Sequence, residues 1–206
     1  MMKKIATLIL TLVALVPAWA GGDDTLDRIE AAGAGLTTLE GSFSQTRTVK
    51  ANGKSSTFSG SFYFSAPDRM AMIYKEDSEG LVLSGDKFFI RRGGKSHKGE
   101  ISHNKQMDHL ASVLFDCVRG QVCSVAEANN ATTAVKTERG TCVVTLTAKK
   151  KTSKGFARIV LRYRSSDMML TGVLLEESSG TINEYTLSGH VAGGTIPASR
   201  FDIPRK

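Results

Sequence analysis

Ser84 and Lys87 are the two residues whose types and spacing come nearest to a catalytic pair. They satisfy the pattern S-x-x-K, in which a serine nucleophile and a lysine share one face at the start of a helix. Here Gly85 holds the second position, and the pattern lies between two segments of strand-forming residues, 81–83 and 88–90. This context favours a hairpin turn. A hydrolase that uses Ser84 and Lys87 for catalysis is a third hypothesis for the function, after the two given below. The hairpin interpretation argues against it, because the catalytic pattern belongs at the start of a helix.

The histidines and cysteines do not have the spacing of a metal site. His97, His103, His109 and His190 form no H-E-x-x-H pattern, and the three cysteines form no C-x-x-C pattern. The chain also has no G-x-S-x-G sequence, no Walker loop and no G-x-G-x-x-G loop. We therefore predict a protein that is not an enzyme and that uses no metal and no cofactor.

Three cysteines are too few, and their number is odd, for a disulfide scaffold. Cys117 and Cys123 lie six positions apart around Gly120, so a small disulfide loop between them is our prediction, although spacing alone does not establish that their Cα atoms are close enough. Cys142 is then predicted to be a buried thiol within a strand.

The first twenty residues resemble a signal peptide. A basic start is followed by a short apolar run, 5–16, and by Ala18-Trp19-Ala20, which matches the A-x-A cleavage pattern. A transmembrane anchor would need about 20 apolar residues, and this run is shorter. We predict cleavage after Ala20, export of the rest of the chain, and one mature domain over residues 21–206.

The composition limits the classes of partner that this domain is expected to bind. The 206-residue chain has a formal net charge of +7, and removal of residues 1–20 leaves about +5. Such an excess favours transient contact with an anionic membrane surface or an acidic partner. No basic helix and no interleaved aromatic and basic residues indicate nucleic-acid binding.

The most informative stretch is 58–90, where apolar residues alternate with polar ones. Successive side chains of a strand point to opposite faces, so the stretch predicts strands that share one continuous apolar wall, continued through 81–83 and 88–90. The residues of the wall from its first two strands are Phe58, Gly60, Phe62, Phe64, Met70, Met72 and Tyr74. Something large must cover this face.

Two longer helices are predicted to provide the cover. Leu26, Ile29, Gly33 and Leu36 recur at helical spacing, which predicts a helix over 26–39. From Gln106 the apolar positions 107, 110, 111, 114 and 118 form the stripe of a second helix over 106–118, which Gly120 terminates. A shorter helix is predicted over 122–128.

The remaining segments predict an antiparallel sheet interrupted once by helix. The other expected strands are 41–49, 134–137, 142–148, 157–164, 172–176 and 182–187, with an edge strand at 200–203 in an otherwise irregular tail, and Arg91 to Gly94 end the first part of the sheet. Twisted sheets of this size tend to curl and to surround a cavity. The predicted class is α+β, a curved antiparallel sheet whose concave apolar face is covered by helices.

The order of these parts resembles the LolA family of periplasmic lipoprotein carriers. The resemblance rests on an N-terminal helix followed by four short motifs: G-S-F-S-Q at 41–45, G-x-F-x-F-x-x-P at 60–67, L-V-L-S-G-D-K at 81–87, and F-x-I-P at 201–204. It implies an incomplete, highly curved β-barrel with a helical lid. It also implies a carrier that accepts lipoprotein acyl chains from an inner-membrane transporter and delivers them to an outer-membrane receptor.

The sequence departs from this family at positions around Pro67. The family often has a basic residue just before the proline, or a basic residue and Trp within the following strand, whereas this chain has Ala66, Ala71 and Met72 there. An arginine latch between barrel and lid is therefore not expected from these positions.

The leading hypothesis is a monomeric carrier, or chaperone, that holds acyl chains in an apolar cavity. The predicted cavity residues are Phe43, Phe58, Phe62, Phe64, Met70, Met72, Tyr74, Leu83, Met107, Leu110 and Leu114. The methionines suit either a close-packed core or a surface that adapts to varied apolar ligands, and periodicity does not separate the two. The alternative function is a lipid-binding or lipoprotein-binding sensor of envelope stress, because fold alone does not decide the task.

Overall fold

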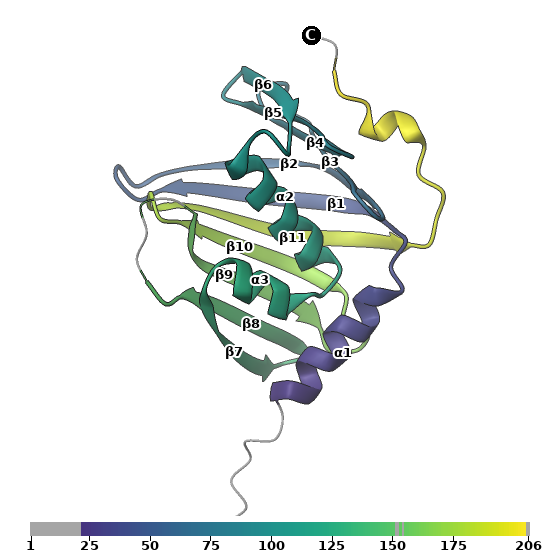
Figure 1. Ribbon diagram of the computed structural model, residues 1–206, viewed down its shortest axis with the longest axis vertical. Helices are drawn as coiled ribbons and strands as arrows, with labels where there is room; N and C mark the ends of the chain where they lie inside the picture. Colours follow the sequence, from purple (N-terminus) through teal and green to yellow (C-terminus); the bar gives the residue numbers. More distant parts are fainter. Residues whose placement is uncertain (1–21, 151–152, 154, 205–206) are drawn as a thin grey trace, which may run out of the picture.

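The computed structural model describes residues 22–150, 153 and 155–204. Within this part of the chain, eleven antiparallel strands form one open sheet, and helices lie over one of its faces (Figure 1). The strand order is β6-β5-β4-β3-β2-β1-β11-β10-β9-β8-β7. The predicted α+β class and the antiparallel sheet are confirmed. The predicted signal peptide lies outside the described residues.

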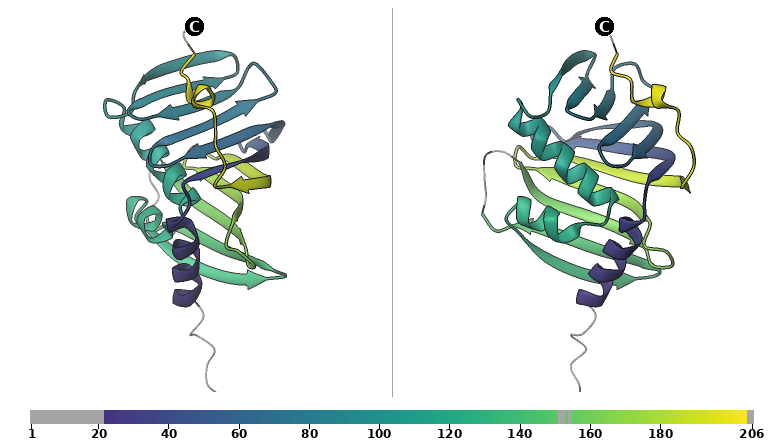
Figure 2. Two further views of the ribbon diagram at one scale, coloured as in Figure 1. Left: turned by 90° about the vertical axis from the view of Figure 1, so that its right-hand side faces the viewer. Right: turned by 45° about the vertical axis from the view of Figure 1, so that its right-hand side comes forward.

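Strands that are adjacent in the sheet are consecutive in the sequence, except for the pair β1 and β11 in the middle of the sheet. The strands are β1 Thr38–Val49, β2 Lys54–Ser65, β3 Arg69–Tyr74, β4 Gly80–Ser84, β5 Lys87–Arg92, β6 Lys95–Glu100, β7 Ala131–Glu138, β8 Thr141–Ala148, β9 Phe156–Arg164, β10 Leu170–Glu177 and β11 Thr181–Ala192. The last strand, β11, pairs with β1 from residues 39 to 49. A sheet of this width curls, and Figure 2 shows it bending around the helices.

The apolar wall forms as the alternation predicts. In the β2–β3 pair Phe62 lies opposite Met72, and Phe64 lies opposite Met70. All four side chains are buried in the larger core cluster, on the face that the helices cover. The residues of opposite parity, Tyr63 and Ala71, belong to a second, smaller cluster on the other face.

Ser84 and Lys87 face each other across the β4–β5 pair, and Gly85 and Asp86 form the turn between them. The predicted hairpin is therefore confirmed. The Asp86 carboxylate accepts hydrogen bonds from the backbone N–H and the hydroxyl of Ser102, at 2.8 and 2.7 Å. Asp86 thus ties this turn to the segment that leads into the next helix.

The prediction that Arg91 to Gly94 end the first part of the sheet is wrong. Gly93 and Gly94 have φ angles of +57° and +79° and turn the chain into the additional strand β6. Every residue of this edge strand is exposed. Its polar sequence has no apolar alternation, because neither of its faces is buried, and so the pattern that finds strands is missing.

The first helix, α1 Gly22–Ala34, ends five residues before the predicted end at 39. Thr38 and Leu39 instead begin β1, where Leu39 pairs with both Phe64 and Ala192 and is fully buried. Hydrogen bonds to two neighbouring strands stabilise this segment more than one further turn of helix would. Gly33 is required by packing, since a Cβ there would lie 1.8 Å from the carbonyl oxygen of Arg119.

The predicted helices over 106–118 and 122–128 are confirmed as α2 Lys105–Val118 and α3 Val122–Ala128. The Asn104 side chain caps α2 by accepting hydrogen bonds from the backbone N–H groups of Gln106 and Met107, both at 3.1 Å. Met107, Ala111 and Val118 of its apolar stripe are buried, and Figure 1 shows α2 lying over the sheet. Among the described residues, no helix is long and apolar enough to cross a membrane.

The predicted edge strand at 200–203 is not formed. Residues Ala198–Phe201 form a short 3-10 helix, and the tail runs along the face opposite the helices (Figure 2). Phe201 is buried there against Ala71, Val82 and Phe89. Its aromatic ring gains more from this contact than an exposed edge strand would offer, and Pro197 limits strand pairing because it has no N–H.

Candidate functional site

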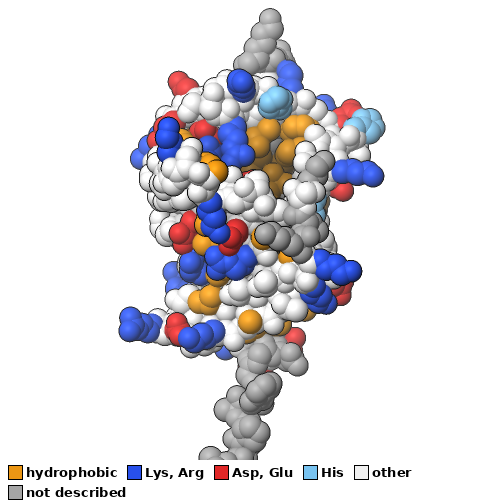
Figure 3. All heavy atoms as spheres, turned by 90° about the vertical axis from the view of Figure 1, so that its left-hand side faces the viewer, with side chains coloured by type: hydrophobic (Ala, Val, Ile, Leu, Met, Phe, Trp, Pro, Cys, Tyr) orange, Lys and Arg blue, Asp and Glu red, His pale blue; other side chains and the backbone are white. Residues whose placement is uncertain are grey.

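A cavity of about 810 Å³ lies between the concave face of the sheet and α2. This volume is near the upper end of the range of about 300–1,000 Å³ that is typical of ligand pockets. Figure 3 looks onto the side of the molecule where the surface is hollowed, and hydrophobic side chains are visible inside the hollow. The helices thus cover the wall without filling all the space in front of it.

The structure brings six of the predicted residues together on the surface of the cavity. They are Phe62, Met70, Met72 and Tyr74 from β2 and β3, and Leu110 and Leu114 from α2. Phe43, Phe64, Leu83 and Met107 are buried in the adjoining core cluster, outside the cavity lining. Phe58 is partly buried at the end of the wall, with its ring 6.2 Å from that of Tyr74.

The far half of the sheet contributes lining residues that the sequence analysis did not propose. They are Leu170, Val173 and Leu175 from β10, and Tyr185 and Leu187 from β11. The sequence predicted both strands, over 172–176 and 182–187. Nothing in it showed that β11 returns to pair with β1 and so continues the same wall.

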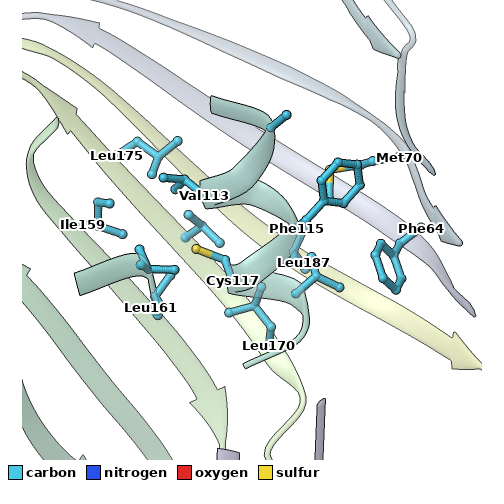
Figure 4. Close-up of a cluster of buried hydrophobic side chains, with 14 of the residues drawn as sticks. Phe64, Met70, Val113, Phe115, Cys117, Ile159, Leu161, Leu170, Leu175 and Leu187 are labelled. Carbon is cyan, nitrogen blue, oxygen red and sulfur yellow. The ribbon is translucent and has the colours of Figure 1, made fainter. Parts of the chain in front are cut away.

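Next to the cavity, α2 packs closely on the sheet. Val113, Phe115 and Cys117 are buried, and in Figure 4 they point from the helix toward side chains of the strands. The rings of Phe64 and Phe115 have centroids 6.3 Å apart. The helix is therefore held by a packed region beside the open space.

A polar network interrupts the apolar wall at one end of the cavity. Arg47 donates two hydrogen bonds to the Glu79 carboxylate, at 3.2 and 2.8 Å, and one of 3.3 Å to the side-chain oxygen of Asn183. Gln45, which is fully buried, donates to the same Asn183 oxygen at 2.9 Å and accepts from the Tyr74 hydroxyl at 2.8 Å. No local sequence pattern reveals this network, because its members lie far apart in the chain.

The network holds Glu79 in its charged form. Burial by itself would raise the pKa of this carboxyl, but hydrogen bonds from Arg47 and from the backbone N–H of Gly93 outweigh burial, so the pKa lies below its usual value. Burial raises the pKa of Tyr74, which keeps the phenol protonated and able to donate. The polar groups at this end of the cavity therefore satisfy one another's hydrogen bonds.

The predicted disulfide between Cys117 and Cys123 is not formed. All three cysteines are free: Cys117 is buried at the end of α2, and Cys123 is exposed on α3. The turn at Gly120 places the two side chains in different surroundings, which the spacing of six did not reveal. Cys142 is buried in β8, as predicted.

The described residues contain no group of three or more His, Cys, Asp or Glu side chains placed to hold a metal ion. His109 makes a 3.1 Å hydrogen bond with the side-chain oxygen of Asn129, and its ring stacks on Phe156 at 5.9 Å. Both neighbours belong to the rim of the cavity. In this arrangement His109 joins α2 to the end of α3 and to β9.

Residues 34–204 match the family model described as outer membrane lipoprotein carrier protein LolA. The chain belongs to the LolA family. A comparison with curated protein sequences found no match. The family assignment therefore rests on a match that spans the sheet and the two helices over the cavity.

Solved structures of low sequence identity are similar to this LolA-family chain. An uncharacterized conserved protein from Thermus thermophilus is 9% identical over 89% of this chain and 94% of its own, with a TM-score of 0.50. An outer membrane lipoprotein-sorting protein domain from Vibrio parahaemolyticus, described as putative in its name, is 10% identical over 86% and 95%, with a TM-score of 0.45. A LolA superfamily protein from Nitrosomonas europaea is 9% identical over 88% and 97%, with a TM-score of 0.42.

The arginine that links helix and sheet in this LolA-family chain comes from the helical side. The guanidinium of Arg119, just after α2, lies 5.8 Å from the ring centroids of both Phe64 and Phe115. The position before Pro67, where the family often has a basic residue, holds Ala66. The contact between helix and sheet thus uses an arginine that the family resemblance did not indicate.

Proposed function

We propose that the protein is a periplasmic carrier. It binds lipoproteins by their acyl chains and moves these lipoproteins from the inner to the outer membrane. The observation that carries the proposal is the cavity of about 810 Å³ between the apolar wall and α2. Membership of the LolA family supports the same assignment. Signal-peptide cleavage after Ala20 is part of this proposal, since residues 1–21 are outside the described part of the chain.

The need for such a cavity follows from the cost of exposing acyl chains to water. A 16-carbon chain gains on the order of 12 kcal/mol on leaving water, at about 0.8 kcal/mol for each buried CH₂ group. Lipoproteins therefore need a cover while they cross an aqueous compartment. In this proposal the acyl chains lie against Met70, Met72 and Leu187, and α2 shields them from water.

Release requires that the cover be displaced. Leu110 and Leu114 line the cavity and are partly exposed, so α2 presents apolar surface to an incompletely filled space. An acyl chain that occupies this space replaces water there, and a partner that binds the open form would favour release. The proposed partners are an inner-membrane lipoprotein-releasing transporter and an outer-membrane receptor, with transient contact at the membrane surface and the carrier acting as a monomer.

The test is a release assay with inner-membrane vesicles that contain the transporter and a radiolabelled lipoprotein. We expect the purified protein, added with ATP, to bring lipoprotein into the supernatant as a one-to-one complex. Vesicles without added protein are the control. If acyl ligands bind to the protein while no lipoprotein leaves the vesicles, the carrier function is wrong, and a lipid-binding sensor becomes the better assignment.

A further inference from the structure

The charges around the cavity are unbalanced. Its lining includes five cationic side chains, from Arg47, Arg91, Arg92, Lys105 and Lys150, and two carboxylates, from Glu79 and Glu177. A cavity whose purpose was only to hide hydrocarbon would not need an excess of positive charge. A cation can meet a ligand only if it is not already engaged within the protein.

Two of the five are engaged. Arg47 is paired with Glu79 and with Asn183, inside the polar network. Arg91 donates to the Ser96 hydroxyl at 3.0 Å and to the Asp77 carbonyl at 2.9 Å. Its guanidinium also lies over Phe89, which belongs to the cluster on the opposite face of the sheet. Neither guanidinium is free to meet a ligand.

Three cations remain at the rim. Lys105 and Lys150 are exposed and form no ion pair with any described residue. Arg92 is half exposed and has one distant ion pair, 3.9 Å from Glu177. That carboxylate already accepts hydrogen bonds from Asn183 at 3.1 Å and from Ser179 at 3.0 Å. In Figure 3, Lys and Arg side chains lie beside the hollow that exposes hydrophobic side chains.

We propose that the cavity takes an acyl chain ending in an anionic group, a carboxylate or a phosphate, whose charge lies among Arg92, Lys105 and Lys150. The inference rests on the proposed acyl-binding cavity and adds a second class of ligand, a free fatty acid or a lysophospholipid, to the lipoprotein. The hydrocarbon lies inside, against Met70 and Leu110, where no charge is present. Hydrogen bonds between such cations and oxyanions are stronger than neutral ones, and the positive rim attracts the anion before it binds.

The test compares ligands that share one chain and differ in the head group. The purified protein is loaded with a pyrene-labelled hexadecanoate, which is displaced by hexadecanoate, by 1-hexadecanoyl lysophosphatidate or by hexadecanol, each below its micelle concentration at pH 8. We expect the carboxylate, the phosphate or both to bind at least about tenfold more tightly than hexadecanol. The two anionic arms show whether the source is a free fatty acid or a phospholipid.

Variants locate the preference on the rim. Removing two charges, in Lys105→Gln with Lys150→Gln, is expected to reduce the ratio of anion to alcohol affinity at least about threefold and to leave hexadecanol affinity unchanged. The matched control is Lys87→Gln, an exposed lysine at the start of β5 that does not line the cavity. A rise in salt from 50 to 500 mM should lower the same ratio in the wild-type protein.

The outcomes separate this inference from the proposed function. If hexadecanol and both anionic ligands bind equally well, or if the double variant keeps the full ratio, the anionic preference is wrong while the acyl-binding cavity stands. If none of the three ligands displaces the probe and the probe itself does not bind, the acyl-binding function fails, and this inference fails with it.

Discussion

The hydroxyl of Tyr163, near the end of β9, donates a hydrogen bond of 3.1 Å to the backbone carbonyl of Cys117 near the end of α2. Both residues are 1% exposed. The last four carbonyl groups of a helix have no partner within it, so this bond ties a helix end to the sheet. It fixes the C-terminal end of α2, beyond the cavity residues Leu110 and Leu114.

Tyr163→Phe is expected to lower the free energy of unfolding by about 1 kcal/mol, the usual net contribution of one hydrogen bond. The loss stays modest because the Cys117 carbonyl also accepts from the N–H of Gly120 at 3.3 Å. Chemical denaturation measures it. Tyr63→Phe is the control, since the Tyr63 hydroxyl has no hydrogen-bond partner among the described residues. Equal stability of wild type and Tyr163→Phe would mean that this bond does not hold the helix.

Leu110→Glu is expected to weaken binding of an acyl ligand at least about tenfold while the melting temperature falls by only a few degrees. Leu110 lines the cavity and is partly exposed. The carboxylate introduced at this position therefore stays hydrated in the empty protein and loses that hydration when an acyl chain enters. Fluorescence titration and a thermal melt measure the two effects.

Ser112→Glu is the control for this change. It adds the same charge to the same helix at an exposed position outside the cavity lining, and it should leave acyl binding intact. If Leu110→Glu unfolds the protein, Leu110 is part of a close-packed core, and the cavity is smaller than the structure indicates.

Glu79→Gln is expected to destabilise the protein at pH 7 by on the order of 1–3 kcal/mol, because it leaves the Arg47 charge without its carboxylate partner. The pKa of Glu79 is lowered in the folded state, so its contribution is present above the ordinary value of about 4.5 and is lost as the pH falls through the folded pKa. The difference in stability between wild type and variant should therefore shrink below about pH 4.5.

Denaturation curves at pH 7, 5 and 3.5 test this dependence. Glu138→Gln removes the exposed ion-pair partner of Lys136 on the edge strand β7 and should change stability by less than about 0.5 kcal/mol at every pH. A constant difference between Glu79→Gln and wild type down to pH 3.5 would mean that the charge of Glu79 is not what stabilises the fold.

Thiol labelling should find one reactive cysteine in the native protein and three in the denatured, unreduced protein. Cys123 is exposed, whereas Cys117 and Cys142 are buried. Burial raises the pKa of the Cys117 thiol, which removes the reactive thiolate. Mass spectrometry after alkylation counts the labels. A single label in the denatured protein would show that Cys117 and Cys123 are joined by a disulfide after all.

Much of the fold was readable from local patterns. Alternation with a period of two identified the wall of Phe62, Phe64 and Met70, and a stripe with a period near 3.6 identified α2, because each pattern reports which side of an element faces away from water. The patterns failed where burial was absent or was decided elsewhere. The exposed strand β6 has no apolar face, and Leu39 lies in β1 only because two neighbouring strands pair with it.

The sequence determined which residues face the helices, and the tertiary structure decided which of them border empty space. Phe64 and Met72 share one face of the wall, yet only Met72 lines the cavity, because Phe115 of α2 packs on Phe64. The polar network is also a tertiary product, since Gln45 and Asn183 are 138 positions apart. Periodicity describes one element at a time, whereas a cavity and its charges arise from the distances between elements.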